Sequence, residues 1–368
     1  MTFLSLLIFS AMAPQKAWAF PEMVRDGYVN CISCHVSPTG GGTLTSYGRA
    51  LSKDILSYAG EDFEAKALYG AVDFPKWILM GGDVRFLQLY SDTPTVRQAT
   101  FFPMEADLEA AAIVGKFTVD ATVGPQENPS VQYPTYGYLF SRRHYLDYKP
   151  TDTLSFRAGR FFPAFGINTP DHIIVTKRGL GWDEGGETYN VEFAYLGEDY
   201  NLYATADFGR PDVPQLNTET GGAFTASTSF LDRYKVGASY YHGTNNSGFR
   251  DLFGPWGILG FTSHFFMLAE FDGQNSVPAA GGQEPTAGMV DYVRVDYELV
   301  QGVHAFLTQQ YSQLDFTNPL TIMRIYGAGL QIFPRPHFEF QFVWEKQQVL
   351  VSSQAYNDYA YILLHFYP

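Results

Sequence analysis

Met104-Glu105-Ala106-Asp107-Leu108-Glu109-Ala110 alternates apolar and acidic residues along its whole length. Because successive side chains of a β-strand point to opposite faces, this stretch has one apolar and one acidic face. Residues 117–123, 293–299 and 338–342 repeat the alternation. In a soluble β-sandwich the apolar face would point inward, whereas in a membrane barrel it meets lipid and the charged face lines the lumen.

The same period of two predicts sixteen strands after Trp77. We expect them near 77–91, 100–114, 116–124, 136–148, 153–163, 187–196, 200–209, 223–231, 233–243, 254–262, 264–273, 287–299, 303–315, 320–333, 337–348 and 356–367. Tight connections alternate with mostly longer ones, such as 164–186, 210–222 and 274–286. Short turns on one rim, long loops on the other and an even strand count are typical of outer-membrane barrels. The sequence therefore predicts an all-β fold, a transmembrane antiparallel β-barrel of about 16 strands over residues 76–368.

The composition agrees with this prediction and excludes other classes. The chain has 368 residues, of which 17% are aromatic, and 35 glycines. A formal charge of −14 excludes a general nucleic-acid binder, because neutralising phosphates requires clustered Lys and Arg. No Ser-His-Asp order, phosphate-binding loop or paired carboxylates with a defined pocket indicate an enzyme class. A soluble sandwich or propeller is the structural alternative.

The first residues predict export. An apolar run over 3–13 precedes Ala17-Trp18-Ala19, which has the small-residue pattern of a signal-peptidase site. The run is far shorter than the ~20 apolar residues that a transmembrane helix needs. We therefore expect a signal peptide over 1–19 and a mature protein in the bacterial outer membrane.

Cys31-Ile32-Ser33-Cys34-His35 has the spacing of a c-type haem attachment motif. In that motif two thiols form thioether bonds with the porphyrin, and the histidine that follows ligates the iron. The alternatives are a redox Cys-x-x-Cys pair or half of a zinc site, but the chain has only two cysteines, so it cannot complete a Cys₄ zinc site. We expect one covalent haem c, attached to Cys31 and Cys34 with His35 as proximal ligand.

Residues 20–75 form the predicted haem module. Residues 37–42 (Ser-Pro-Thr-Gly-Gly-Gly) predict a flexible turn, and a helix is indicated by Leu44, Tyr47, Leu51, Ile55 and Tyr58, with Gly60 at the C-cap position. A segment of ~50 residues buries too little surface to cover a haem alone. A barrel of about sixteen strands has a bore wide enough to admit the module as a plug.

The sequence does not identify the sixth ligand of the iron. Met23 is the methionine nearest to the motif in sequence, and Met80 is the second candidate. His304, His337 and His365 lie near tight turns, where we expect ordinary rim histidines.

The haem motif behind a signal peptide, the stretch Thr45-Ser46-Tyr47-Gly48-Arg49 and the porin-like barrel together resemble the fused outer-membrane monohaem c-type cytochrome–porins. Members of that family are regarded as iron oxidases of the cell surface. The resemblance implies electron transfer across the outer membrane, with an extracellular donor such as Fe(II) and a periplasmic carrier such as a soluble cytochrome. The alternatives are electron export to extracellular acceptors, and a passive diffusion porin whose haem is a redox gate or a stabiliser.

Two further hypotheses concern the lumen. The loop from Phe161 to Trp182 is a candidate for an inward-folded constriction, since long loops often carry function. Glu105, Asp107, Glu109 and Asp120 form an acidic row that would either attract cations or simply line a water-filled bore. We favour the second reading, because Arg85, Arg157 and Arg294 are predicted on the same face.

Overall fold

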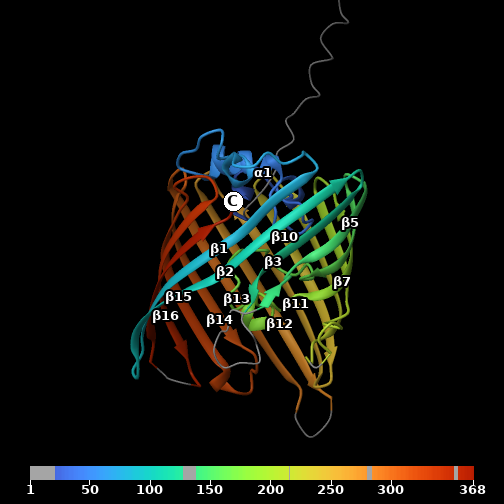
Figure 1. Ribbon diagram of the computed structural model, residues 1–368. Helices are drawn as coiled ribbons and strands as arrows, with labels where there is room; N and C mark the ends of the chain where they lie inside the picture. The colour runs from blue at the N-terminus through green and yellow to red at the C-terminus, as the bar shows by residue number, and fades with distance from the viewer. Residues whose placement is uncertain (1–20, 127–137, 215, 280–283, 352–354) are drawn as a thin grey trace, which may run out of the picture.

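The computed structural model describes residues 21–126, 138–214, 216–279, 284–351 and 355–368. Within them, 17 strands form one antiparallel sheet that closes where β1 (Ile78–Asp92) pairs with β17 (Asn357–Phe366) (Figure 1). Because β4 and β5 both pair with β3, they share one position, and the 17 strands occupy 17 − 1 = 16 positions around the barrel. The predicted signal peptide lies outside the described residues.

The strands follow one another around the barrel in chain order. Their bounds are β2 Arg97–Val114, β3 Phe117–Gln126, β4 Tyr138–Phe140, β5 His144–Thr151, β6 Leu154–Phe161, β7 Thr188–Leu196, β8 Tyr200–Asp207, β9 Thr220–Phe230, β10 Tyr234–Asn245, β11 Gly248–Gly260, β12 Phe265–Pro278, β13 Thr286–Val300, β14 Val303–Gln313, β15 Ile322–Ile332 and β16 Phe338–Val349. The predicted strands are confirmed, and the one predicted near 136–148 is β4 plus β5. One connection is shorter than the predicted strands at 233–243 and 254–262 imply: β10 and β11 extend toward each other and leave only Asn246 and Ser247 between them.

The two faces of the sheet are arranged as in a barrel that is embedded in lipid. On β2, Glu105, Asp107 and Glu109 are 8%, 4% and 3% exposed, whereas Leu108 between them is 56% exposed. Arg85 and the other predicted lumen arginines are also buried. The apolar residues thus face outward and the charges inward, which excludes the soluble sandwich. Among the described residues no helix is long and apolar enough to cross a membrane.

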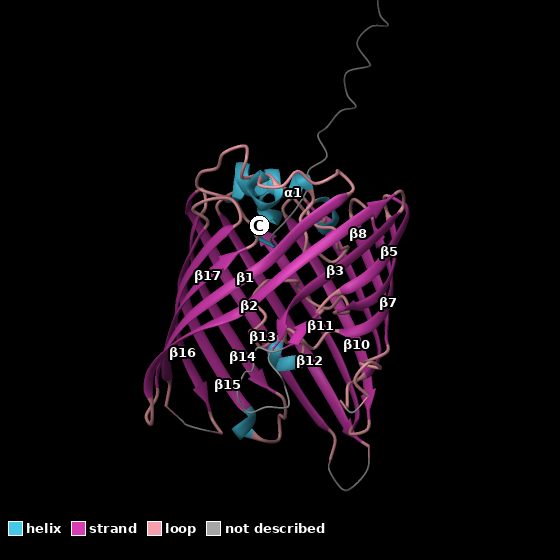
Figure 2. Cartoon of the chain, in the orientation of Figure 1, coloured by secondary structure: helices cyan, strands magenta, loops and turns pink. Residues whose placement is uncertain are grey.

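The N-terminal module covers the rim of the barrel at which the chain also ends (Figures 1 and 2). It contains short helical turns, η1 (Pro21–Asp26), η2 (Cys31–Ser33) and η4 (Ala67–Gly70), and one continuous helical stretch, α1 (Ser46–Leu51) followed by the π-turn η3 (Ser52–Leu56). The helix predicted over this stretch is therefore present. The Thr45 side chain caps it by accepting a hydrogen bond from the Gly48 amide at 3.1 Å.

The predicted C-cap of this helix is wrong. The helix ends at Leu56, and Gly60 lies beyond it. The Tyr58 amide instead donates to the Phe333 carbonyl, 2.7 Å away, in the turn between β15 and β16. Contact with the barrel rim therefore ends the helix, and Tyr58 is 64% exposed rather than part of an apolar helix face.

Residues 162–187, here called the lumen loop, connect β6 to β7 and cross the interior of the barrel. Phe165, Val175 and Leu180 pack in one cluster with residues of β9, β10, β11, β13 and β15. Backbone amides of the loop also bond to the wall, as when the Ile167 amide donates to Glu270 Oε2 at 2.9 Å. The hypothesis of an inward-folded constriction is confirmed.

Candidate functional site

A cavity of about 330 Å³ lies between the module, the lumen loop and the barrel wall. Cys31, His35 and the glycines 40–42 line it from the module, and residues 162–170 line it from the lumen loop. The wall contributes Tyr203, Lys235, Trp256 and Ile258 from β8, β10 and β11, and Asp83, Arg85, Glu105 and Asp107 from β1 and β2. The module therefore forms one boundary of a chamber inside the barrel.

The three residues of the predicted haem motif are brought together by one tight turn. The Cys34 and His35 amides both donate to the Cys31 carbonyl, at 3.2 and 3.0 Å. Thr45 fixes the other side of the turn, since its amide donates to the Cys34 carbonyl at 2.7 Å and its hydroxyl to the Ser33 carbonyl at 2.8 Å. Cys31 and His35 line the cavity, whereas Cys34 is fully buried beside it.

The surroundings of this turn fit a covalently attached haem. Cys34 packs in an apolar cluster with Met23 and Leu51, and the cluster reaches the cavity through Leu44 and Trp256. Such an environment would suit one side of the apolar ring of a porphyrin, and Cys31, Cys34 and His35 are the residues that would hold it.

Glycines keep the chain close to both cysteines. Gly40 has a positive φ of 84°, and a Cβ there would lie 3.3 Å from Cys31 Sγ. At Gly48 a Cβ would come within 2.5 Å of the Cys34 carbonyl oxygen, so α1 packs directly on the motif. Larger residues at these positions would push the motif away from its neighbours.

The candidates for a sixth iron ligand lie in different places. Met23 is fully buried in the cluster that contains Cys34, and the described lining of the cavity includes neither Met23 nor Met80. His365 lines the cavity, but its two nitrogens lie 2.9 Å from Asp83 and from Glu339. His304 is buried against Asp296.

His337 lies in the turn between β15 and β16 and contacts the ring of Tyr69 from the module. Burial and the nearby Arg49 guanidinium together lower its pKa to about 3. This histidine is therefore neutral at the rim where the module docks.

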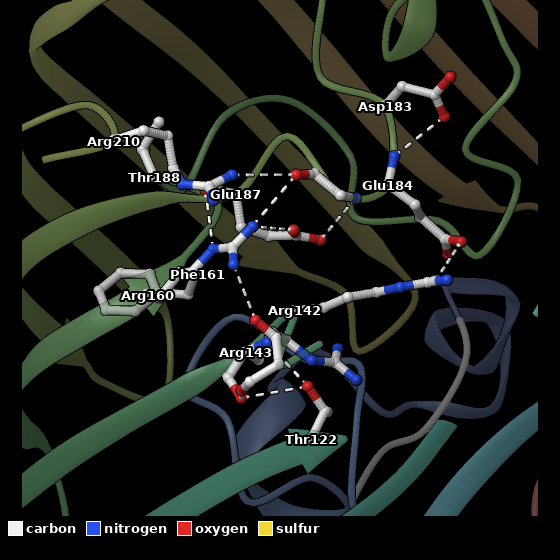
Figure 3. A network of polar contacts seen from close by, with 12 residues as sticks. Thr122, Arg142, Arg143, Arg160, Phe161, Asp183, Glu184, Glu187, Thr188 and Arg210 are labelled. Atoms are coloured by element: carbon white, nitrogen blue, oxygen red, sulfur yellow. Dashed lines mark hydrogen bonds and ion pairs between the residues drawn. The ribbon is translucent and has the colours of Figure 1, made fainter. Parts of the chain in front are cut away.

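Ion pairs hold the lumen loop against the wall (Figure 3). Glu184 of the loop lies 2.9 Å from Arg142 and 3.3 Å from Arg85. Arg142 also pairs with Glu105 at 2.9 Å, and Arg143 pairs with Glu109 at 3.2 Å. Arg142 and Arg143, which lie between β4 and β5, therefore balance Glu105 and Glu109 of the acidic row, which supports the reading that these residues line the lumen.

Farther along the loop, Arg160 lies 3.4 Å from Glu187, and Arg160 and Arg210 both donate to the Gly185 carbonyl (Figure 3). Both guanidinium groups also lie near the Phe140 ring, at 4.1 and 5.6 Å from its centroid. These pairs were not predicted, because their partners are dozens of residues apart and only the closed barrel brings them together.

The module is also tied to the rim by charged contacts. Arg25 Nη2 lies 2.9 Å from Glu298 Oε2, and Arg335 pairs with Glu64 of the module. Arg49 on α1 is 3% exposed, donates to the carbonyls of Met80 and Pro368, and has its pKa lowered by burial to about 10. These contacts connect the module to β1, β13 and the end of β17.

No family model and no curated protein matches the chain. Among solved structures it is similar to a loop-deletion mutant of OmpT from Vibrio cholerae, with a TM-score of 0.61 and 11% identity over 79% of this chain and 99% of that one. It is also similar to the channel DcaP of Acinetobacter baumannii (TM-score 0.56, 12% identity, 79% and 97% covered) and to OprB of Pseudomonas putida (TM-score 0.56, 10% identity, 78% and 94% covered). At these identities the likeness concerns the fold. The chain is a porin-like β-barrel of the bacterial outer membrane.

Proposed function

We propose that this protein transfers electrons across the outer membrane through one haem c, attached to Cys31 and Cys34 and ligated by His35. The observation that carries the proposal is the place of the motif: Cys31 and His35 line a chamber inside a membrane barrel. A diffusion channel has no need of a thiol and an imidazole at the wall of its lumen, with a second thiol buried directly beside them.

When bound, the haem supplies one-electron redox chemistry. The chain's own residues would hold it: Cys31 and Cys34 would attach it, His35 would ligate its iron, and the apolar cluster around Cys34 would exclude water from one side. Met23 is buried in that cluster and is the candidate for a second iron ligand. Axial ligands and burial are the protein's means of setting the potential.

The two ends of the barrel differ, and this difference suggests where the electron enters and where it leaves. A donor such as Fe(II) would approach from the end with the long loops and stop at the lumen loop, whose acidic residues are paired with wall arginines. A periplasmic carrier would meet the module, whose outer side exposes Tyr47, Tyr58 and Phe63. We propose that extracellular Fe(II) is the reductant and a soluble cytochrome the acceptor.

Proteoliposomes test this proposal. The holoprotein would be reconstituted with an oxidised cytochrome inside the vesicles, and Fe(II) would be added outside. We expect reduction of the enclosed cytochrome, and none with the Cys31→Ser/Cys34→Ser variant. A reduction potential well below that of the ferrous/ferric couple, or transfer only from inside to outside, would contradict iron oxidation and favour electron export.

A second function, passive diffusion of solutes, is favoured by the likeness to porins and channels. In that case the haem would be a gate or a stabiliser. Planar bilayers distinguish the two functions, because a diffusion porin has a large conductance that does not depend on haem, whereas an electron carrier with an ion-paired lumen loop conducts little.

A further inference from the structure

We propose that the turn 36–42, directly after the haem motif, is a docking element that the barrel recognises, and that Arg157 of β6 is the residue that positions it. The part of this inference that concerns the cofactor rests on the proposed function. The docking itself concerns only the chain, and it can be tested without haem.

Three side chains from the barrel and the lumen loop donate to three backbone carbonyls of this turn. Lys149 Nζ donates to the Val36 carbonyl at 3.3 Å, and Tyr203 Oη donates to that of Pro38 at 3.1 Å. Asn168 Nδ2, from the lumen loop, donates to the Thr39 carbonyl at 2.9 Å. Because carbonyls are contacted, the barrel recognises the conformation of the turn as well as its sequence.

Arg157 contacts two side chains of the same turn, those of Ser37 and Thr39. Its Nη1 donates to Ser37 Oγ at 3.0 Å and its Nη2 to Thr39 Oγ1 at 3.4 Å. The same Nη2 lies 2.7 Å from Glu192, and the guanidinium carbon lies 3.7 Å from the centroid of the Phe161 ring. Glu192 balances the charge, the Phe161 ring lies against the guanidinium, and Nη1 and Nη2 donate to the turn.

Burial makes this arrangement rigid. Arg157 and Glu192 have side chains that are 2% and 1% exposed, and Glu192 accepts a second hydrogen bond from Thr205 at 3.0 Å. A buried guanidinium without its partners is costly, so the wall favours the one position of the turn that provides the two hydroxyls. Arg157 therefore links the wall of β6, β7 and β8 to the module.

The position of the turn sets the position of the motif. Val36 follows His35, and its amide donates to the Thr43 carbonyl at 3.0 Å, which closes the turn at its base. Gly40, at the tip, lies against the Cys31 side chain. Displacing Ser37 and Thr39 would therefore move both Cys31 and His35 within the chamber.

The test compares Arg157→Gln and Arg157→Lys with Arg160→Gln. Arg160 lies on the same strand, is equally buried and pairs with Glu187, but it contacts no described residue of the module. Hydrogen exchange of the 36–42 amides is measured in the detergent-folded barrel, and the reduction potential is measured on the holoprotein. Losing hydrogen bonds to a charged group predicts roughly 10-fold faster exchange in Arg157→Gln, with partial rescue by Lys.

The control variant should leave both the exchange of the turn and the potential unchanged. Unchanged exchange and potential in Arg157→Gln would overturn the proposal, and so would an equal effect of Arg160→Gln. If Arg157→Gln does not fold, Ser37→Ala/Thr39→Val carries the test, because it removes the two hydroxyls that Arg157 contacts, and unaltered exchange of the turn in that variant has the same meaning. A chain that binds no haem but exchanges as expected would refute the proposed function and leave the docking intact.

Discussion

The ion pairs of Glu184 predict that the lumen is closed at the lumen loop and that losing this charge opens it. Glu184→Gln keeps the shape of the side chain but removes two ion pairs, with Arg85 and Arg142. A hydrogen bond to a charged group contributes roughly 1.5–3 kcal/mol, and the lower value applies because the Glu184 side chain is one-quarter exposed. Losing two such contacts should cost about 3 kcal/mol. Because about 1.4 kcal/mol corresponds to a tenfold change in an equilibrium, the population of the displaced loop should rise roughly 100-fold.

Single-channel recording in planar bilayers measures this population. We expect rare, brief openings in the wild type and frequent openings in Glu184→Gln. A variant in which a short linker replaces 166–184 should stay open. Arg178→Gln is the matched control, because Arg178 is 66% exposed and its ion pair with Asp183 in the same loop should contribute little. A wild-type conductance that is as large and steady as that of the linker variant would refute the reasoning.

Four other predictions follow from single residues. His35→Ala should keep its covalent haem but lose the absorbance spectrum of the axially ligated iron, and an unchanged spectrum would exclude His35 as ligand. Because Cys34 is fully buried, haem added to the folded apo-barrel should not attach, whereas mass spectrometry should find it attached when it is supplied before folding. Leu108→Arg should destabilise the barrel in vesicles by up to ~2–4 kcal/mol in urea titrations, since it faces lipid, while Glu109→Gln faces the lumen and should cost less. The pKa of His337 is lower in the folded protein than in the unfolded chain, so the free energy of unfolding should fall as the pH drops from about 6.5 toward 3, by up to about 1.4 kcal/mol per pH unit. Urea titrations at each pH measure this dependence, and His337→Phe should remove it.

The parts of this fold that could be predicted depend on local patterns. The alternation around Leu108 depends only on the period of a strand, so it predicts which residues face lipid and which face the lumen. The turn that joins Cys31 to His35 is equally local. The bounds of β10 and β11 differ from the prediction, because cross-strand pairing extends them beyond the alternating segments.

The contacts that make the chamber could not be predicted in this way. Arg157 and Ser37 are 120 residues apart, and they meet only because the sheet closes and the module enters it. The pairing of Glu184 with Arg142 likewise depends on the path of the lumen loop. In the sequence, Arg142 falls within a predicted strand and Glu184 within a predicted loop, and nothing in the spacing marks them as partners.

The most direct test of the account is the haem content of the barrel itself. The protein would be expressed in a host with a working haem-attachment system, purified from the outer-membrane fraction, and analysed for haem per chain and for the mass of the peptide that contains Cys31 and Cys34. The account predicts one haem per chain, bound to that peptide by two thioether bonds. A folded outer-membrane barrel whose peptide has two free thiols and no haem would contradict it.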